Sequence, residues 1–398
     1  MSKKSATAPK PRNRKASRPA IPEVIQRMLW GAAAGRCEFA GCNRELSRAD
    51  TTKQRVNLAE MAHIIAFSDV GPRGDASRSN ALATDIDNLM LVCDLCHKLF
   101  DRRKDDYPEA LLRDMKQRHE RRILLVSAID ENRQSHVLLY GANIGKQAAA
   151  ISYERAAVAM LPEWYPADSN AIEIGLVNSS FRDESDEYWK VEESHLRNMI
   201  NQQVRPLLDR GVIKHLSIFG LAPQPLLMQL GFLLSDIPVA EVYQLHREPP
   251  TWRWQNQLAK TDYVLTEPTQ FDGIPALVFG LSGTVNDDRI HAVLGSNVSI
   301  WRLGLAMPHN DFLQSSEQLK GFREEARRLM NRIKAAHGEH VTLNVFPAMP
   351  VAAAVDFGRV IMPKADLAIR IYDEHKGRGG FVHSLNLDAC SRLPEKKY

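Results

Sequence analysis

Two pairs of cysteines constrain the N-terminal third of this 398-residue chain more than any other feature of its sequence. Cys37 and Cys42 form a C-x4-C pair, and Cys93 and Cys96 form a C-x2-C pair 50 residues further on. Paired thiolates at this spacing suit a tetrahedral Zn²⁺ ion. The long polar segment between the pairs has too few apolar residues to fold alone, and a zinc ion would join its ends. We therefore assign the four cysteines to a closed structural zinc site and expect Cys390 to be unpaired.

Basic side chains are concentrated in the same third, although the net charge of the whole chain is only +4. Residues 1–19 hold seven Lys or Arg and no acidic residue, and residues 98–122 hold nine more basic side chains. This distribution suits a polyanionic partner, and it equally fits a solvated tail and a solvated helix face. We expect residues 1–20 to be a disordered basic tail. Without an apolar run of 18 residues or a signal sequence, we expect no membrane partner and a cytoplasmic location.

A His–Asn–His series, formed by His63, Asn88 and His97, accompanies the cysteine pairs, and Asp101 lies one helical turn after His97. Hydrolysis of a phosphodiester needs an activated water and stabilisation of charge at the leaving oxygen. A histidine can take the proton of that water near pH 7. A single histidine in an apolar strand is more often a core residue, but the combination with a zinc frame indicates a metal-dependent nuclease.

Residues 30–120 resemble the HNH (ββα-metal) endonucleases. The matching segments are Cys37…Cys42, Ala62-His63-Ile64, Gly71-Pro72-Arg73, Asp87-Asn88-Leu89 and Cys93-Asp94-Leu95-Cys96-His97-Lys98-Leu99-Phe100-Asp101.

The resemblance implies a role for each member of the series. His63 would be the general base, and Asn88 the middle residue of the motif, which holds the ββα loop in place. His97 would ligate the catalytic divalent ion, Mg²⁺ or a similar metal, and Asp101 would support that ion. The implied substrate is double-stranded DNA.

The sequence departs from the family pattern directly before the base, where many members have Asp or His and this chain has Ala62. The missing ligand must come from elsewhere, from Glu60, Asp101 or a water. Arg73 and Arg78, in the polar loop after the base, are candidate contacts to DNA phosphates, with solvent exposure as the equal alternative.

The pattern of the chain changes at about residue 161, where strands and helices begin to alternate. Such alternation predicts an α/β domain with a mostly parallel sheet. Helices are expected at 22–35, 108–126, 143–160, 187–208, 223–234, 314–337 and 351–360. Strands are expected at 172–177, 213–219, 239–245, 276–280, 298–305, 341–346, 367–372 and 382–387. We divide the chain into the tail, a nuclease domain at 21–130, a helical connector at 131–160 and a sensor domain at 161–398.

A weak internal repeat runs through the last part of the chain. Phe219 and Pro223 follow one strand, Phe346 and Pro350 follow another, and each pair precedes an apolar helix and a further strand. Proline is favoured where a helix begins. We interpret the repeat as two Rossmann-like halves packed as one domain, with chance similarity between two β-α-β units as the alternative.

Ligands of such sheets bind beyond the carboxyl ends of the strands. The loops there are 178–182, 220–223, 282–286 and 347–350, and none is a dinucleotide-binding or Walker A motif. Trp252 and Trp254 flank Arg253 in an arrangement that suits base stacking and phosphate pairing, although one or both tryptophans would equally fit the core. The residues predicted to bind ligand are Trp252, Arg253, Trp254, Ser282, Phe346 and Pro347.

Residues 161–398 resemble the SAVED domain, a fused pair of CARF-like subdomains that binds cyclic oligonucleotides. The matching segments are Leu343–Pro350, Val355–Arg359 and Ala368–Asp373. The order of an HNH domain and then a SAVED domain resembles the effector nucleases of bacterial CBASS anti-phage systems. The resemblance implies activation by a cyclic di- or trinucleotide that a partner CD-NTase makes. It also implies ligand-driven assembly of a homo-oligomer, from dimer to tetramer, that pairs the HNH domains.

Two other classes of protein fit the same sequence. A modification-dependent restriction endonuclease would use its C-terminal domain to read bases and would need no small ligand. A zinc-ribbon regulator would bind DNA without cutting it, and Ala62 mildly favours this class.

Overall fold

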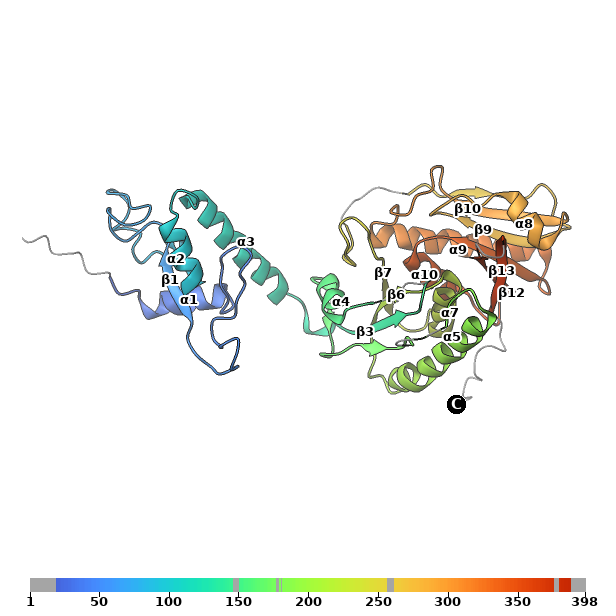
Figure 1. The fold of residues 1–398 in the computed structure, drawn as a ribbon, viewed down its shortest axis with the longest axis horizontal. Helices are drawn as coiled ribbons and strands as arrows, with labels where there is room; N and C mark the ends of the chain where they lie inside the picture. Colours follow the sequence, from blue (N-terminus) through green and yellow to red (C-terminus); the bar gives the residue numbers. More distant parts are fainter. Residues whose placement is uncertain are drawn as a thin grey trace, which may run out of the picture. The chain divides into compact units, whose positions relative to one another are not determined.

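The computed structural model describes residues 19–145, 150–176, 179, 181–255, 261–375 and 379–387. The chain forms two compact units that divide after Ile129 (Figure 1). Residues 1–18 of the expected disordered tail, and Cys390, lie outside the described residues. Among the helices that the structure describes, none is long and apolar enough to cross a membrane.

The first unit is built around a pair of strands and the helix that follows them. Strand β1 (Ala59–His63) pairs antiparallel with β2 (Leu89–Cys93), and α2 (Asp94–Arg102) begins directly after β2. A short 3-10 turn, Ile86–Asn88, leads into β2. Helices α1 (Glu23–Ala32) and α3 (Glu109–Ser127) confirm the predicted helices at 22–35 and 108–126, and each begins after a proline.

The first sheet of the second unit is entirely parallel. Its order is β4-β3-β6-β7, and β5 also pairs with β3. The strands are β3 (Gln134–Gly141), β4 (Tyr165–Pro166), β5 (Ile172–Glu173), β6 (Leu216–Leu221) and β7 (Ala240–Tyr243). The helices are α4 (Tyr153–Met160), α5 (Asp186–Met199) with a π-helical turn (Ile200–Val204) and α6 (Arg205–Asp209), and α7 (Gln224–Leu234).

Strand β3 corrects the expected connector at 131–160. We expected a helical linker there, but residues 134–141 form an inner strand of the first sheet, and the helical residues described in that segment are a 3-10 turn (Glu131–Arg133) and α4. The side chains of Leu138 and Tyr140 are fully buried in the main core of the second unit. The segment is therefore part of the second unit and not a linker to it.

The second sheet is parallel at its centre and antiparallel at both edges. Its order is β13-β12-β11-β9-β10-β8. The strands are β8 (Val264–Thr266), β9 (Ile274–Gly280), β10 (Val298–Gly304), β11 (Thr342–Ala348), β12 (Ala368–His375) and β13 (Gly380–Leu387). The helices are α8 (Asp287–Leu294), α9 (Ser316–His337) and α10 (Val351–Val360). These α/β sheets confirm most of the predicted strands, whereas α8, β4 and β8 were not predicted.

The two copies of the sequence repeat occupy corresponding places in the two sheets. Phe219 lies opposite Tyr243 and stacks on it with ring centroids 4.5 Å apart, and Phe346 stacks on Tyr372 at 4.6 Å. The helices of the two copies, α7 and α10, pack directly against each other (Figure 1). Their backbones approach so closely that a Cβ added at Gly231 would lie 1.9 Å from the carbonyl oxygen of Val355.

Candidate nuclease site and sensor unit

His63, the predicted base, is the last residue of β1, and its side chain is only 8% exposed. Its Nε2 lies 2.8 Å from the carbonyl oxygen of Ala83. A carbonyl oxygen can only accept a hydrogen bond, so Nε2 donates this bond and carries a proton. When the ring is neutral, this tautomer has its lone pair on Nδ1, where it could take a proton from a water.

Asn88 forms hydrogen bonds to the loop that begins just after His63. Its Oδ1 accepts a hydrogen bond from the backbone N–H of Ile65 at 2.9 Å. Its Nδ2 donates to the carbonyl oxygens of Ile65 at 2.9 Å and Leu82 at 3.1 Å. The amide is fully buried, so these bonds fix the exit of β1 against the segment that leads into β2.

His97 and Asp101 lie one turn apart on α2 and are partly exposed. The Nε2 of His97 is 3.2 Å from the Oδ2 of Asp101. Burial raises the pKa of the Asp101 carboxyl, but the hydrogen bonds from His97 and Arg73 outweigh that effect and lower the pKa below its ordinary value. The carboxylate is therefore ionised at neutral pH and can bind a cation.

The two arginines predicted to contact DNA phosphates are engaged inside the protein. The side chain of Arg73 is 8% exposed and donates to Ile64, Phe100 and Asp101. Arg78 is about half exposed and pairs with Asp75 and Glu109.

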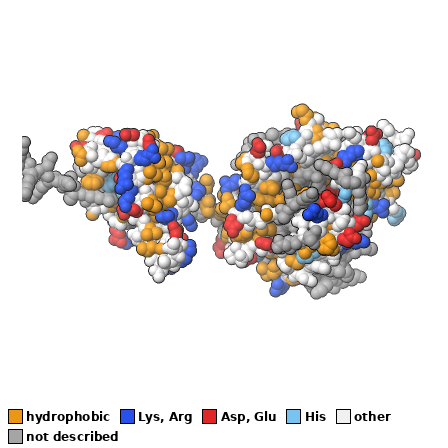
Figure 2. All heavy atoms as spheres, in the orientation of Figure 1, with side chains coloured by type: hydrophobic (Ala, Val, Ile, Leu, Met, Phe, Trp, Pro, Cys, Tyr) orange, Lys and Arg blue, Asp and Glu red, His pale blue; other side chains and the backbone are white. Residues whose placement is uncertain are grey.

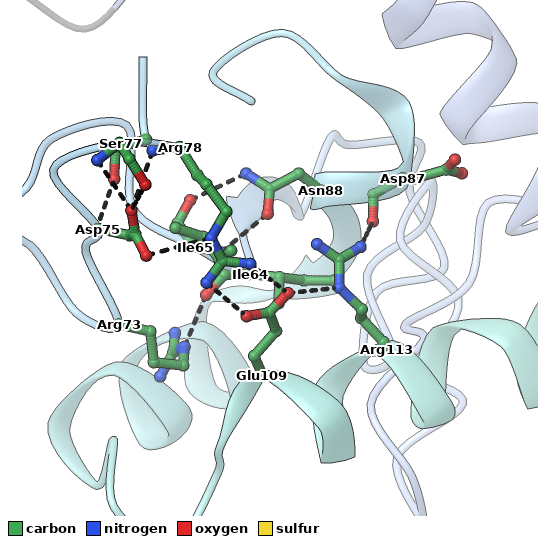
Figure 3. A network of polar contacts seen from close by, with 11 residues as sticks. Ile64, Ile65, Arg73, Asp75, Ser77, Arg78, Asp87, Asn88, Glu109 and Arg113 are labelled. Carbon is green, nitrogen blue, oxygen red and sulfur yellow. Dashed lines mark hydrogen bonds and ion pairs between the residues drawn. The ribbon is translucent and has the colours of Figure 1, made fainter. Parts of the chain in front are cut away.

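Figure 3 shows how these contacts join the loop after β1 to α3. Glu109, at the start of α3, lies between Arg78 and Arg113. Arg113 in turn donates to the carbonyl oxygen of Asp87 at 2.9 Å, next to Asn88. Sequence reasoning missed Glu109 and Arg113, because they lie on a helix beyond the motif and no local pattern marks them as its partners.

The four predicted zinc ligands meet at one point. The sulfur atoms of Cys37, Cys42, Cys93 and Cys96 all lie within 4.8 Å of one another, and Cys42 and Cys93 are 3.9 Å apart. Adjacent sulfurs around a tetrahedral zinc, with Zn–S bonds of ~2.3 Å, lie about 3.8 Å apart. The backbone N–H of Cys93 donates to the Cys37 sulfur at 3.4 Å, which favours the thiolate form that a metal needs. The donor set therefore fits a structural zinc ion.

The predicted site of the catalytic ion has fewer protein ligands than the four-cysteine site. His97 and Asp101 offer one nitrogen and one carboxylate, and the cysteine cluster is the sole group of three or more potential ligands among the described residues. Glu60 and Ala62 share one face of β1 and His63 occupies the other, since side chains alternate along a strand. Two protein donors completed by waters and substrate phosphate fit Mg²⁺, which usually keeps several of its waters.

The aromatic residues predicted to bind ligand differ in their exposure. Trp252 is 4% exposed and packs edge-on against Phe219, so it is a core residue. Trp254 is half-buried, with its ring 6.4 Å from that of Tyr243. Phe346 is fully buried between aromatic rings, which leaves no face of its side chain open to a ligand.

Of the other three predicted ligand contacts, Ser282 and Pro347 lie on neighbouring segments of the second sheet. Arg253 is exposed and donates to the carbonyl oxygen of Val158. Pro347 is buried in β11. Ser282 is bound through its backbone N–H to the carbonyl oxygen of Ala348 at 2.8 Å, in the loop after β9.

A pocket of about 320 Å³ lies beside the carboxyl end of β12, where no site was predicted. It is lined by Ile144, Gly145, Asp183, Glu184, Asp186, Trp189, Asp373, Glu374, His375, Val382 and Ser384. Burial raises the pKa of the Asp373 carboxyl to about 7, and nearby Asp183 and Glu374 add to the rise.

Comparison with known proteins identifies both units. Residues 37–104 match a family model described as HNH endonuclease, and residues 196–387 match the SAVED model, described as "SMODS-associated and fused to various effectors sensor domain". The chain thus joins an endonuclease domain to a sensor domain. In this order of domains it is similar to HNH–SAVED proteins, and the HNH match indicates phosphodiester hydrolase activity with the divalent metal that HNH nucleases use. A search of curated proteins gave no match.

Solved structures with a similar fold include SAVED/CARF-domain containing receptors called Cap4. The Acinetobacter baumannii receptor with the cyclic trinucleotide 2'3'3'-cAAA is 13% identical, with a TM-score of 0.42 over 79% of this chain and 67% of that chain. The same receptor with 3'3'3'-cAAA is 14% identical, with a TM-score of 0.43 over the same shares. The Moraxella osloensis receptor is 12% identical, with a TM-score of 0.39 over 70% of this chain and 59% of that chain.

Proposed function

We propose that this protein is a cyclic-oligonucleotide-activated, metal-dependent endonuclease that degrades double-stranded DNA in anti-phage defence. The observation that carries the proposal is the presence, in one chain, of an endonuclease domain and a sensor domain of a family fused to effectors. The basic side chains on the first unit, many of them visible in Figure 2, suit a DNA substrate.

Each residue of the site has a role in this proposal. His63, with its proton on Nε2, takes the proton of the attacking water at Nδ1, and Asn88 keeps the strand end in place. His97 and Asp101 would hold the catalytic divalent ion, which would stabilise the charge of the phosphate and leaving oxygen. The four cysteines would hold a structural zinc ion.

The sensor unit supplies control in the same proposal. A cyclic di- or trinucleotide made by a partner CD-NTase binds the SAVED domain and drives assembly of a homo-oligomer. An HNH domain cuts one strand at a time, so pairing two such domains converts nicks into double-strand breaks.

Incubation of plasmid DNA with protein, Mg²⁺ and a panel of cyclic di- and trinucleotides tests the function. We expect one panel member to trigger conversion of supercoiled DNA to linear fragments, and His63→Ala to abolish cutting while DNA binding persists. The control is Glu193→Gln in the second unit, where Glu193 pairs with Arg197 one turn along α5.

Failure of every cyclic nucleotide to trigger His63-dependent cutting would exclude the proposal. Cutting that needs modified bases and no small ligand would point instead to a modification-dependent restriction endonuclease. Salt-sensitive DNA binding without any cutting would point to a non-catalytic regulator.

A further inference from the structure

Arg73 connects the strand that carries the base to the helix that carries the metal donors. Its Nε donates to the carbonyl oxygen of Ile64, the residue after His63, at 2.6 Å. Its Nη1 donates to the carbonyl oxygen of Phe100 at 2.9 Å, and its Nη2 to the Oδ1 of Asp101 at 2.8 Å. All three nitrogens of one guanidinium thus have partners within the nuclease site.

The contact to Phe100 has a local cause. The last carbonyl groups of a helix have no partner within the helix, and Phe100 lies two residues before the end of α2. Arg73 supplies the missing donor, and its guanidinium also lies 5.2 Å from the centre of the Phe100 ring. The backbone of Arg73 has a φ of 54°, a left-handed conformation that is uncommon for a residue other than glycine.

The contact to Asp101 determines which carboxylate oxygen faces a metal. Arg73 holds Oδ1, and Oδ2 lies 3.2 Å from the Nε2 of His97. Two adjacent ligands of an octahedral Mg²⁺, each ~2.1 Å from the ion, lie about 3.0 Å apart. Oδ2 and Nε2 share a hydrogen bond in the structure, and they would become neighbouring ligands once a metal ion displaced the proton between them.

We infer that Arg73 is a positioning residue of the nuclease site: it fixes Asp101 through Oδ1, so that Oδ2 and the His97 Nε2 bind one divalent ion together. Arg73 does not contact DNA phosphate in this arrangement, because its side chain is 8% exposed and each of its nitrogens is engaged. The inference rests on the proposed metal-dependent nuclease.

The test is a Mn²⁺ titration of the full-length, zinc-loaded chain followed by electron paramagnetic resonance, without DNA or activator. The binding that His97→Ala removes defines the site. We expect Arg73→Lys to weaken that binding by about tenfold, the usual effect of removing a partner of a metal ligand. The matched control is Arg27→Lys on α1, where Arg27 is exposed and pairs with Glu23, and it should bind Mn²⁺ as the wild type does.

A second variant covers the case in which Arg73→Lys does not fold. Asp101→Asn keeps the Arg73 bonds to Ile64 and Phe100 and should also weaken Mn²⁺ binding at least tenfold. Where both variants fold, Arg73→Lys should have no further effect on Mn²⁺ binding in the Asp101→Asn background, because Arg73 acts through Asp101.

DNA binding measured in the inactive His63→Ala background separates the two roles of Arg73. A positioning residue leaves DNA affinity and its salt dependence unchanged. The inference is overturned if Arg73→Lys binds Mn²⁺ like the wild type, or if it lowers DNA affinity and reduces the salt slope by about one, as loss of a phosphate contact does. Because the titration omits activator and DNA, its outcome is independent of whether any cyclic nucleotide triggers cutting.

Discussion

Asn88 shows at the scale of one residue how the nuclease site depends on a buried amide. Removal of the side chain would leave both backbone groups of Ile65 unpaired, whereas the Leu82 carbonyl would keep its bond from the Asp85 N–H. Each buried polar group left without a partner costs about 1–3 kcal/mol. The amide therefore couples the stability of the first unit to the position of the base.

Asn88→Ala should lower the free energy of unfolding of the first unit by about 3 kcal/mol and abolish DNA cutting. Urea denaturation of the full chain, with a probe in the first unit, measures the change. The control is Asn57→Ala, since Asn57 is exposed and makes one bond to the N–H of Ala59. If the two substitutions lowered the free energy of unfolding equally, the hydrogen bonds of Asn88 would not stabilise the first unit.

Glu192 presents the opposite case, a buried carboxyl. Within the part of the chain that the structure describes, neither of its oxygens has a hydrogen-bond partner, and burial raises its pKa to about 7. The groups that face it include the hydroxyls of Tyr140 and Tyr188. Since the folded state holds the proton more tightly than the unfolded state, stability is greatest below the unfolded pKa and falls as the pH rises to about 7.

Glu192→Gln should therefore stabilise the second unit at pH 8 by about 3 kcal/mol, since each unit of pKa shift corresponds to ~1.4 kcal/mol. The variant's stability should also depend less on pH between 5 and 7. Urea denaturation at pH 5 and pH 8 measures both effects. The neighbouring Glu193→Gln is the control, because Glu193 is paired with Arg197 and should change stability little. A wild-type chain more stable at pH 8 than Glu192→Gln would contradict the prediction.

The crossing of α7 and α10 is the feature that matters most at the scale of elements. Gly231 lies against the backbone of α10, and a Cβ added at Gly358 would lie 2.0 Å from the carbonyl oxygen of Met228 on α7. Helix backbones can approach this closely only where no side chain separates them. The two glycines thus allow the halves of the sequence repeat to pack as one domain.

Gly231→Ala or Gly358→Ala should destabilise the second unit by more than 3 kcal/mol, because the backbones of α7 and α10 must move apart. Gly321→Ala on α9 is the matched control, since its added Cβ would meet Tyr263 at an ordinary 3.6 Å. It should stabilise the helix by up to about 1 kcal/mol. Thermal melting of the three variants measures the contrast, and a neutral Gly231→Ala would refute the close crossing.

The boundary between the units is a property of the whole molecule. The two units divide after Ile129, and β3 begins at Gln134 as a strand paired on both sides. A chain that begins at residue 161 lacks this strand and exposes the buried side chains of β6, Leu216 and Ile218 among them. The second unit therefore needs the segment from about residue 130.

A chain of residues 130–398 should unfold cooperatively and elute as a single species, whereas residues 161–398 should aggregate or lack a thermal transition. Circular dichroism and size-exclusion chromatography distinguish the two, with the full chain as reference. The same melting temperature for both truncated chains would show that β3 is dispensable.

The residues of the nuclease motif were predictable because their chemistry and spacing are local. The C-x4-C and C-x2-C pairs predicted a four-cysteine metal site, and the structure brings the four sulfurs together. Proline at the helix starts and the alternation of apolar runs identified α1, α3 and α10 and most of the strands. The Phe-x-x-x-Pro repeat likewise marked equivalent positions in the two sheets.

Contacts between residues far apart in the chain could not be predicted from the sequence and required the tertiary structure. Arg73 looked like a phosphate contact, because an arginine in a polar loop gives no sign that three acceptors surround it. The Ala-rich residues after 143 suggested a connector, but pairing with β6, about 80 residues later, makes the segment before them an inner strand.

The sequence by itself thus determined the chemistry of this protein: the metal-binding thiols, the His–Asn–His series and the succession of strands and helices. Only the tertiary structure decided how these parts meet, including the place of β3, the crossing at Gly231 and the orientation of Asp101 by Arg73. The physical reason is that residue types and their spacing fix local chemistry, whereas burial and long-range hydrogen bonds exist only once distant segments pack together.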